Sequence, residues 1–242
     1  MKQIDHLLII DPAVKKPEIE SYNRIALAAP YPVTYHLPAM YGFTSIEKVS
    51  ENISGIVVLG SAASVHDGHS WQDAITELIL DAFENNIPVM GICYGHQLLA
   101  HIFGGTVGPL WNGKKKQGQR NVDLKENMLW GAARSGLMIF SHQEGVTKCP
   151  DDFVITAVSD MVAIDGFASK TKPIWGFQTH IEATQAFIDD HNVPNVNSHE
   201  AFEFGHRLLD NFILRANTRL PLRSTKNSLP YMREAWLPRT PS

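Results

Sequence analysis

Short apolar runs alternate with amphipathic stretches along the first hundred residues of the chain. The runs have the length and composition of buried strands, and they cover residues 3–11, 31–37, 55–60 and 87–93. Apolar residues near helical spacing predict helices over residues 17–29, 45–51 and 71–84, with another helix directly after residue 93. Strands that alternate with helices favour a mostly parallel sheet covered by helices on both faces.

The pattern changes after Gly105, where strand-like segments follow one another with turns and little helix between them. These segments cover residues 106–111, 119–126, 136–142, 153–160, 161–168 and 173–180. We expect them to extend the edge of the sheet or to form a small second sheet beside it. Two helices are predicted at the end, over residues 182–190 and 199–217. The pattern therefore predicts an α/β fold with a doubly wound, mostly parallel sheet, flanking helices and a small additional antiparallel region.

Composition supports one globular domain, which we expect to cover residues 1–214. The 242 residues are 44% hydrophobic and 19% charged. The formal net charge of -4 does not indicate binding of nucleic acid by the chain as a whole. No apolar run approaches the roughly 18 residues of a membrane-spanning helix. Residues 215–242 are expected to form a separate basic, proline-containing tail. Two cysteines and the lack of a leader-like start favour a reducing, cytoplasmic setting.

Cys93 lies between two glycines, in the segment GICYG, where a predicted strand meets a predicted helix. Gly91 and Gly95 would let the strand and the helix approach closely, and the sharp turn would strain the backbone of the residue at its tip. The positive end of the helix dipole at this point favours a thiolate. The segment is therefore a candidate nucleophile elbow, although a small buried apolar cysteine explains the pentapeptide alone equally well.

His180 and Glu182 lie two residues apart at the end of a strand-like segment, so an extended backbone would put them on one face. A carboxylate beside an imidazole fixes its tautomer and stabilises its charged form, as the base of a cysteine nucleophile requires. Taken alone, the pair is better explained by a surface histidine and a glutamate in the first turn of the next helix. His66 and His69 lack further ligands at suitable spacing, so a turn and a helix cap explain them better than a metal site.

The two segments together resemble the class I glutamine amidotransferase domain, whose pattern is Gly-x-Cys-x-Gly-x-Gln followed by Gly-x-Gln-x-His-Pro-Glu. GICYGHQ at residues 91–97 and GFQTHIE at residues 176–182 carry the resemblance. Residues 57–67 (VVLGSAASVHD) resemble the family's oxyanion-hole loop, and residues 140–146 (FSHQEGV) resemble its Ser-His-x-Asp-x-Val segment. The resemblance spans residues 5–212 and implies a flavodoxin-like core. The chain looks most like free-standing glutaminase modules that resemble the one of guanosine-monophosphate synthetase.

The resemblance implies a role for each matching position. Cys93 is the expected nucleophile, His180 the base and later the acid, and Glu182 the group that orients the imidazole. The backbone amides of Gly60 and Tyr94 are the expected oxyanion hole. The expected substrate contacts come from the remaining motif residues, which are Gln97, Ser141, His142 and Gln143. The resemblance implies that the reaction at these residues needs no metal and no organic cofactor.

Three departures from the family pattern surround the expected substrate site. Ile181 stands where the family has proline, and Glu144 replaces an aspartate. The oxyanion loop at residues 60–64 reads Gly-Ser-Ala-Ala-Ser instead of Gly-Gly-Pro-x-Ser, which leaves its preformed shape in question. The nucleophile, the base and the carboxylate are all kept, so these departures suggest altered substrate choice more than lost chemistry.

The resemblance implies hydrolysis of the side-chain amide of glutamine, or of a related γ-glutamyl amide, through a thioester. A biosynthetic amidotransferase passes its ammonia to a synthase. Because the chain has no nucleotide-binding glycine-rich loop, we expect a separate synthase subunit or independent action. Two alternatives stay open: a stand-alone γ-glutamyl peptidase or hydrolase, and a catalytically silent docking module that binds a partner through its basic tail. A homo-oligomer is also left open, and no nucleic acid or membrane partner is expected.

Overall fold

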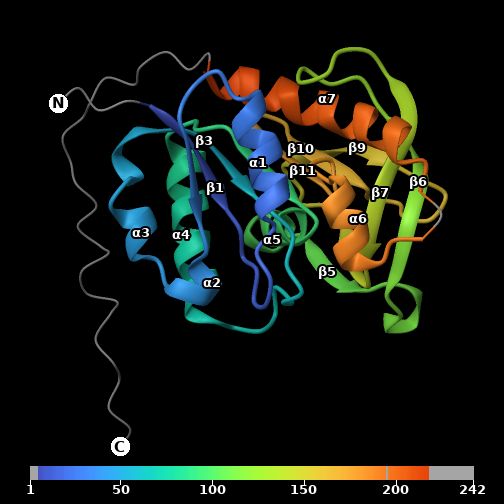
Figure 1. Ribbon diagram of the computed structural model, residues 1–242, viewed down its shortest axis with the longest axis horizontal. Coiled ribbons are helices and arrows are strands. Elements are labelled where there is room, and N and C mark those ends of the chain that lie inside the picture. The colour runs from blue at the N-terminus through green and yellow to red at the C-terminus, as the bar shows by residue number, and fades with distance from the viewer. Residues whose placement is uncertain (1–4, 195, 218–242) are drawn as a thin grey trace, which may run out of the picture.

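The computed structural model describes residues 5–194 and 196–217, so the tail expected beyond residue 217 lies outside the described residues. A nine-stranded sheet has the order β2-β1-β3-β4-β11-β10-β9-β6-β7, and a two-stranded sheet, β5-β8, accompanies it (Figure 1). The strands are β1 (His6–Ile10), β2 (Val33–His36), β3 (Ile53–Val58), β4 (Val89–Ile92), β5 (Thr106–Pro109), β6 (Lys116–Leu124), β7 (Arg134–His142), β8 (Glu144–Lys148), β9 (Phe153–Val158), β10 (Gly166–Ser169) and β11 (Ile174–Phe177). The helices are α1 (Ile19–Ala28), α2 (Pro38–Tyr41), α3 (Thr44–Glu47), α4 (Ser70–Glu84), α5 (Tyr94–Ile102), α6 (Gln185–His191) and α7 (Ser198–Asn217), with 3-10 helices η1 (Ser50–Asn52) and η2 (Trp111–Gly113).

Strands β2, β1, β3, β4 and β11 are parallel to one another, in the 2-1-3-4-5 order of a flavodoxin-like sheet. β1 and β3 are buried at every residue, as parallel strands covered on both faces must be. Leu7 and Ile9 of β1 join the hydrophobic cluster that includes α7, whereas Leu8 and Ile10 join the cluster that includes α4 and α5. The expected doubly wound, mostly parallel sheet with flanking helices is confirmed.

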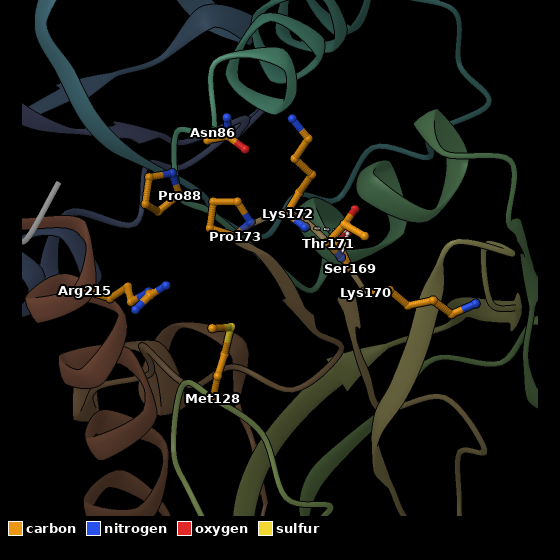
Figure 2. Close-up of a pocket in the computed structure, with 9 residues that line it drawn as sticks. All are labelled: Asn86, Pro88, Met128, Ser169, Lys170, Thr171, Lys172, Pro173 and Arg215. Atoms are coloured by element: carbon orange, nitrogen blue, oxygen red, sulfur yellow. Dashed lines mark hydrogen bonds between the residues drawn. The ribbon is translucent and has the colours of Figure 1, made fainter. Parts of the chain in front are cut away.

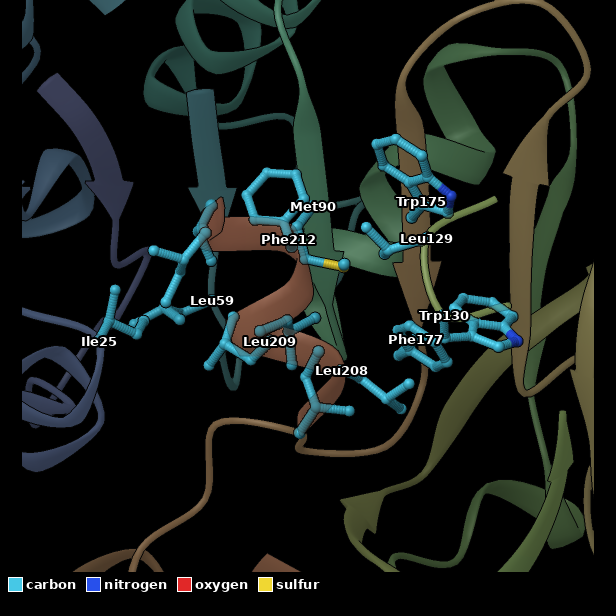
Figure 3. Close-up of a cluster of buried hydrophobic side chains, with 14 of the residues drawn as sticks. Ile25, Leu59, Met90, Leu129, Trp130, Trp175, Phe177, Leu208, Leu209 and Phe212 are labelled. Carbon is cyan, nitrogen blue, oxygen red and sulfur yellow. The ribbon is translucent and has the colours of Figure 1, made fainter. Parts of the chain in front are cut away.

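The C-terminal helix α7 anchors the middle of this sheet. Figure 3 shows Leu209 and Phe212 of α7 in the same buried cluster as Met90 of β4 and Trp175 of β11. The rings of Trp175 and Phe212 meet edge to face, with centroids 6.2 Å apart. Burial of large side chains on one helix therefore stabilises the two adjacent strands whose carboxyl ends border the candidate site.

The remaining strands extend the sheet in antiparallel fashion. β10 pairs with β11, β9 with β10, β6 with β9, and β7 with β6. The short strands β5 and β8 pair with each other as a separate antiparallel sheet. Both arrangements expected for the second half of the chain therefore occur together. Among the described residues, no helix combines the length and the apolar composition that crossing a membrane requires.

Several predicted boundaries are wrong. The helix expected over residues 45–51 is divided into α3 and η1. The helix α2 before it was not predicted; it ends at Tyr41 and is followed by Gly42 as C-cap residue, with a φ of 77°. The strand expected over residues 161–168 is reduced to β10, because Ser159 and Val162 form a tight turn through two hydrogen bonds of 3.0 Å. Strand β8 was also not predicted. It follows β7 after a single residue, too close for the pattern to separate two strands.

The helix expected from Glu182 begins instead at Gln185. Thr184 is the N-cap residue, and its hydroxyl oxygen accepts a hydrogen bond from the Phe187 amide at 3.4 Å. Glu182 therefore lies outside the helix, and the helix-start explanation of this residue is wrong.

Candidate active site

Cys93 is the single residue between β4 and α5. Its φ of 51° and ψ of -100° lie in a region that side chains other than glycine rarely adopt. The Cys93 amide donates a hydrogen bond of 2.8 Å to the carbonyl oxygen of Phe177, at the end of the neighbouring strand β11. The predicted strained turn at the end of a buried strand is confirmed, and β11 holds it in position.

Two glycines make this turn possible. A Cβ added at Gly91 would lie 2.4 Å from the carbonyl oxygen of Gly95, and one added at Gly95 would lie 2.2 Å from that of Val58. Both distances are far inside van der Waals contact. Helix α5 therefore packs directly on the backbone of β4 and β3, as the predicted role of the glycines requires.

His180 and Glu182 form a buried pair. The imidazole Nδ1 lies 2.8 Å from the carboxylate Oε1, and the side chains are 6% and 1% exposed. Burial lowers the pKa of His180, but the carboxylate and the nearby Cys93 sulfur raise it by more, so the pKa lies above its usual value. A surface position for this histidine, which was the simpler explanation of the sequence, is therefore wrong.

Ile181 leaves the geometry of this pair intact. The residue is 1% exposed, and it packs so closely on α7 that a Cβ added at Gly205 would lie 3.1 Å from its Cα. The amide of His180 donates to the carbonyl of Ile139 at 2.8 Å, and the amide of Ala183 donates to the carbonyl of His180 at 3.3 Å. Packing and backbone hydrogen bonds thus hold the segment in the absence of proline.

Cys93, His180 and Gly60 come together at the carboxyl edge of the parallel strands. A Cβ added at Gly60 would lie 2.9 Å from Cε1 of His180 and 3.6 Å from Cβ of Cys93. Tyr94 is the first residue of α5, where a backbone amide has no acceptor within the helix. Its side chain is buried, and its hydroxyl accepts a hydrogen bond of 2.9 Å from Gln72. The positions of Gly60 and Tyr94 are compatible with the expected oxyanion hole, which stays a prediction.

Serine side chains brace the oxyanion loop, which lacks the family's second glycine and proline. The Ser61 hydroxyl donates to the carbonyl of Pro12 at 2.7 Å and accepts from the amide of Ala63 at 3.1 Å. The Ser64 hydroxyl donates to Oε2 of Glu144 at 2.9 Å. The loop is therefore tied both to the β1–α1 connection and to β8.

The predicted substrate contacts differ in how accessible their polar atoms are. Gln97 is 4% exposed, and its amide nitrogen donates to the carbonyl of Glu144 at 2.9 Å. Both ring nitrogens of His142 are engaged, Nε2 with Arg120 at 3.0 Å and Nδ1 with the Glu144 carbonyl at 2.9 Å. The other two predicted contacts are Ser141, whose buried hydroxyl has no hydrogen-bond partner among the described residues, and Gln143, whose side chain is exposed.

Gln178 belongs to the site but received no role from the sequence. It is fully buried, its amide nitrogen lies 3.7 Å from the Cys93 sulfur, and its amide oxygen accepts from Gln97 at 3.2 Å. The signal was present, because Gln178 is the glutamine of the Gly-x-Gln-x-His pattern. The sequence held no such signal for Arg120 and Asp165, which form a buried ion pair. Arg120 of this pair also contacts His142.

The surface hollow drawn in Figure 2 lies away from this chemistry. It has a volume of about 430 Å³, and Pro88 and Pro173, which precede β4 and β11, line it together with Met128 and Arg215. These prolines mark the amino ends of the strands, whereas Cys93 follows a carboxyl end. The hollow is therefore separate from the candidate active site.

The structure offers little support for a metal at His66 and His69. Within residues 5–194 and 196–217, no three His, Cys, Asp or Glu side chains gather as a ligand set. His69 is the N-cap residue of α4, and its amide donates to the Gln72 side chain at 2.8 Å. The helix-cap explanation is confirmed for His69. The two cysteines, Cys93 and Cys149, are both free thiols.

The chain matches the sequence profile of a known protein family. The sequence profile of the family described as Glutamine amidotransferase class-I matches residues 31–196. One subunit of the glutamine-hydrolyzing GMP synthase of Methanopyrus kandleri is 32% identical over 142 residues, which make up 57% of this chain and 72% of that protein. The glutamine-hydrolyzing GMP synthase of Bacteroides fragilis is 30% identical over 143 residues, which make up 58% of this chain but only 27% of that protein.

Solved structures agree at the level of the fold. A glutamine amidotransferase from Thermotoga maritima superposes with a TM-score of 0.68 at 20% identity, covering 89% of this chain and 99% of that one. One from Methylobacillus flagellatus gives a TM-score of 0.68 at 17% identity, covering 93% of this chain and 98% of that one. The profile match covers more than half of the chain and includes all four motif segments. The chain therefore belongs to the class I glutamine amidotransferase family.

Proposed function

We propose that the chain hydrolyses the side-chain amide of glutamine, or of a related γ-glutamyl amide, with Cys93 as nucleophile. One observation carries the proposal: the strained cysteine at the start of α5 lies beside a buried imidazole that is hydrogen-bonded to a carboxylate at 2.8 Å. In this proposal His180 is the base and acid, and Glu182 is the orienting group. Relatives named as glutamine-hydrolyzing GMP synthases support glutamine as the substrate.

The first half-reaction forms a thioester. Nδ1 of His180 donates a hydrogen bond to Glu182, which leaves Nε2 to hold the proton taken from the Cys93 thiol. The thiolate attacks the carboxamide carbon, and the electron pair of the C=O bond moves to oxygen. When the tetrahedral species collapses, the C–N bond breaks, and the proton on Nε2 of His180 passes to the leaving nitrogen. Ammonia departs, and a γ-glutamyl thioester remains on Cys93.

The second half-reaction releases glutamate. Nε2 of His180 takes a proton from water as the water oxygen attacks the thioester carbon, and the C–S bond breaks when the second tetrahedral species collapses. The sulfur leaves as thiolate and recovers its proton from the imidazolium. We propose the amides of Gly60 and Tyr94 as donors to both oxyanions. Loss of one such donor typically costs about 100- to 1000-fold in rate.

The substrate end of the site is also part of the proposal. Gln97, Ser141 and Gln143 would contact the bound amino acid, and the unpartnered hydroxyl of Ser141 supports that assignment.

The Methanopyrus kandleri relative is named as one subunit of a synthase, which supports a separate synthase partner that receives the ammonia. The two cysteines are both free, as is typical of proteins in reducing compartments, so the cytoplasm stays the proposed location. The division into residues 1–214 and 215–242 stays a proposal, and α7 continues to Asn217, past that boundary.

The test combines covalent labelling with a substrate panel. The protein is incubated with a diazo-ketone analogue of glutamine, and mass spectrometry locates the adduct. Glutamate release is then measured from glutamine and from several γ-glutamyl amides and peptides, with and without an added synthase. We expect the adduct on Cys93, and Cys93→Ala should abolish both labelling and turnover.

Cys149→Ala is the matched control, because this second free thiol should neither be labelled nor be needed. Turnover that survives Cys93→Ala would refute the proposal. Activity on γ-glutamyl peptides alone would identify a stand-alone peptidase.

A further inference from the structure

A buried ion pair contacts His142, one of the predicted site residues. Arg120 of β6 donates a hydrogen bond from one terminal nitrogen to Asp165, which precedes β10, and the two side chains are 1% and 0% exposed. Removing two opposite charges from water is unfavourable, and their mutual attraction often only offsets that cost. Stability is therefore a weak explanation for this pair, and its other contacts indicate a different role.

The second terminal nitrogen of Arg120 defines the protonation state of His142. It lies 3.0 Å from Nε2 of His142. A guanidinium can only donate, so Nε2 must be the acceptor and the ring proton must be on Nδ1. Nδ1 lies 2.9 Å from the carbonyl oxygen of Glu144, to which it donates. Burial first, and the charge of Arg120 second, lower the pKa of His142 to about 3, so the ring is neutral.

The same carbonyl connects His142 to the nucleophile. The Glu144 carbonyl also accepts from the amide nitrogen of Gln97 at 2.9 Å, and that nitrogen lies 3.2 Å from the amide oxygen of Gln178. The amide nitrogen of Gln178 lies 3.7 Å from the Cys93 sulfur. An unbroken series of polar contacts therefore runs from the buried guanidinium to the reacting sulfur.

We propose that Arg120 and Asp165 are a positioning pair for the proposed reaction: they hold His142 as the neutral Nδ1-H tautomer, which orients the Gln97 and Gln178 amides around Cys93. His142 is then a bridge between the pair and β8, and it is not a direct substrate ligand. Arg120 also stacks over the Phe140 ring, with its guanidinium carbon 4.5 Å from the ring centroid. Stacking and the Asp165 carboxylate together fix the plane of the guanidinium. This inference rests on the proposed function.

The first measurement reads the tautomer directly and does not depend on activity. Protein labelled with ¹⁵N-histidine is studied by NMR at pH 7, and the His142 signals are assigned with His142→Asn. We expect a neutral ring with its proton on Nδ1. A ring with its proton on Nε2, or a charged ring, would overturn the inference even if the enzyme proves active.

The second measurement removes the pair. In Arg120→Met, Nε2 of His142 loses its donor while Nδ1 keeps the Glu144 carbonyl as acceptor. We therefore expect the ¹⁵N signal of Nε2 to shift and kcat for glutamine hydrolysis to fall about 10-fold or more, with a smaller change in KM. Arg120→Met combined with Asp165→Leu removes both charges, so it avoids leaving one of them buried alone. The double variant should fold, yet show the same shifted Nε2 signal and low kcat. A double variant with the wild-type Nε2 signal and a kcat within about twofold of wild type would overturn the inference.

Arg24→Met is the matched control. Arg24 of α1 makes a hydrogen-bonded ion pair with Asp210 of α7 at 2.7 Å, and neither side chain contacts His142. This variant should keep the kcat and the His142 tautomer of wild type. If both Arg120 variants fail to fold, the tautomer in the wild-type protein decides. If the wild-type protein hydrolyses no γ-glutamyl amide, the proposed function fails, whereas the tautomer still tests the structural part of the inference.

Discussion

We predict that the buried His96 makes the folded protein less stable in acid. The residue lies on α5, three positions after Cys93, and is fully buried with its ring stacked on Phe167 at a centroid distance of 4.4 Å. Burial lowers its pKa to about 3, although the backbone of Ile164 and Gly176 opposes part of that shift. We predict that His96→Asn, which keeps a polar nitrogen near the Nδ1 position but cannot titrate, removes this acid sensitivity.

The magnitude follows from proton linkage. An unfolded histidine titrates near pH 6.5, whereas His96 in the folded protein stays neutral down to about pH 3. Between these values the unfolded state binds one more proton, so the free energy of unfolding falls as the pH falls. From pH 7.5 to pH 5.0 the loss from His96 is about 2 kcal/mol, at roughly 1.36 kcal/mol per pH unit below pH 6.5. His142 adds a similar loss that both proteins share, so it cancels in the comparison.

The assay is urea unfolding of the wild type and the variant at several values between pH 5.0 and pH 7.5. The variant should be less stable at neutral pH because its packing is poorer, and this offset should not depend on pH. The difference in unfolding free energy between the two proteins should therefore move by about 2 kcal/mol in favour of the variant at pH 5.0. The exposed His199, changed to Asn, is the control. A difference between wild type and His96→Asn that stays constant with pH would refute the reasoning.

Three further predictions concern the reaction. Gly60→Ala should lower kcat about 10- to 100-fold, because its Cβ would lie 2.9 Å from the His180 ring; Gly108→Ala, where the nearest atom is 3.9 Å away, should have little effect. Glu182→Gln should lower kcat about 100-fold. It should also shift the alkaline limb of the pH–kcat profile to lower pH, because the carboxylate raises the pKa of His180; an unmoved limb would contradict this. Ser61→Ala should lower kcat about 10-fold by freeing the oxyanion loop, and Ser61→Thr should restore it if the hydroxyl is responsible.

Local features of the chain were sufficient for much of the fold and of the site. The apolar runs of β1, β3 and β4 are continuous because parallel strands are buried on both faces. A short stretch of sequence is therefore enough to predict each of these strands. The turn at Cys93 was also predictable, since only glycine permits the contacts at Gly91 and Gly95. The two-residue spacing of His180 and Glu182 predicted that their side chains could meet, but the extended backbone expected for them is wrong. β11 ends at Phe177, and the Ala183 amide donates to the carbonyl of His180, so a turn brings the two side chains together.

Tertiary structure alone decided which of these local features meet. The pairing of β11 with β4 brings His180 to Cys93, and no periodicity within either segment encodes that long-range choice. The contact of Arg120 with Asp165, and that of Gln178 with Cys93, likewise form only when segments distant in sequence come together. Short windows of sequence determine whether a segment can be a strand or a turn. Strand order and buried polar contacts depend on the packing of the whole chain, because their free energy comes from groups that become neighbours only on folding.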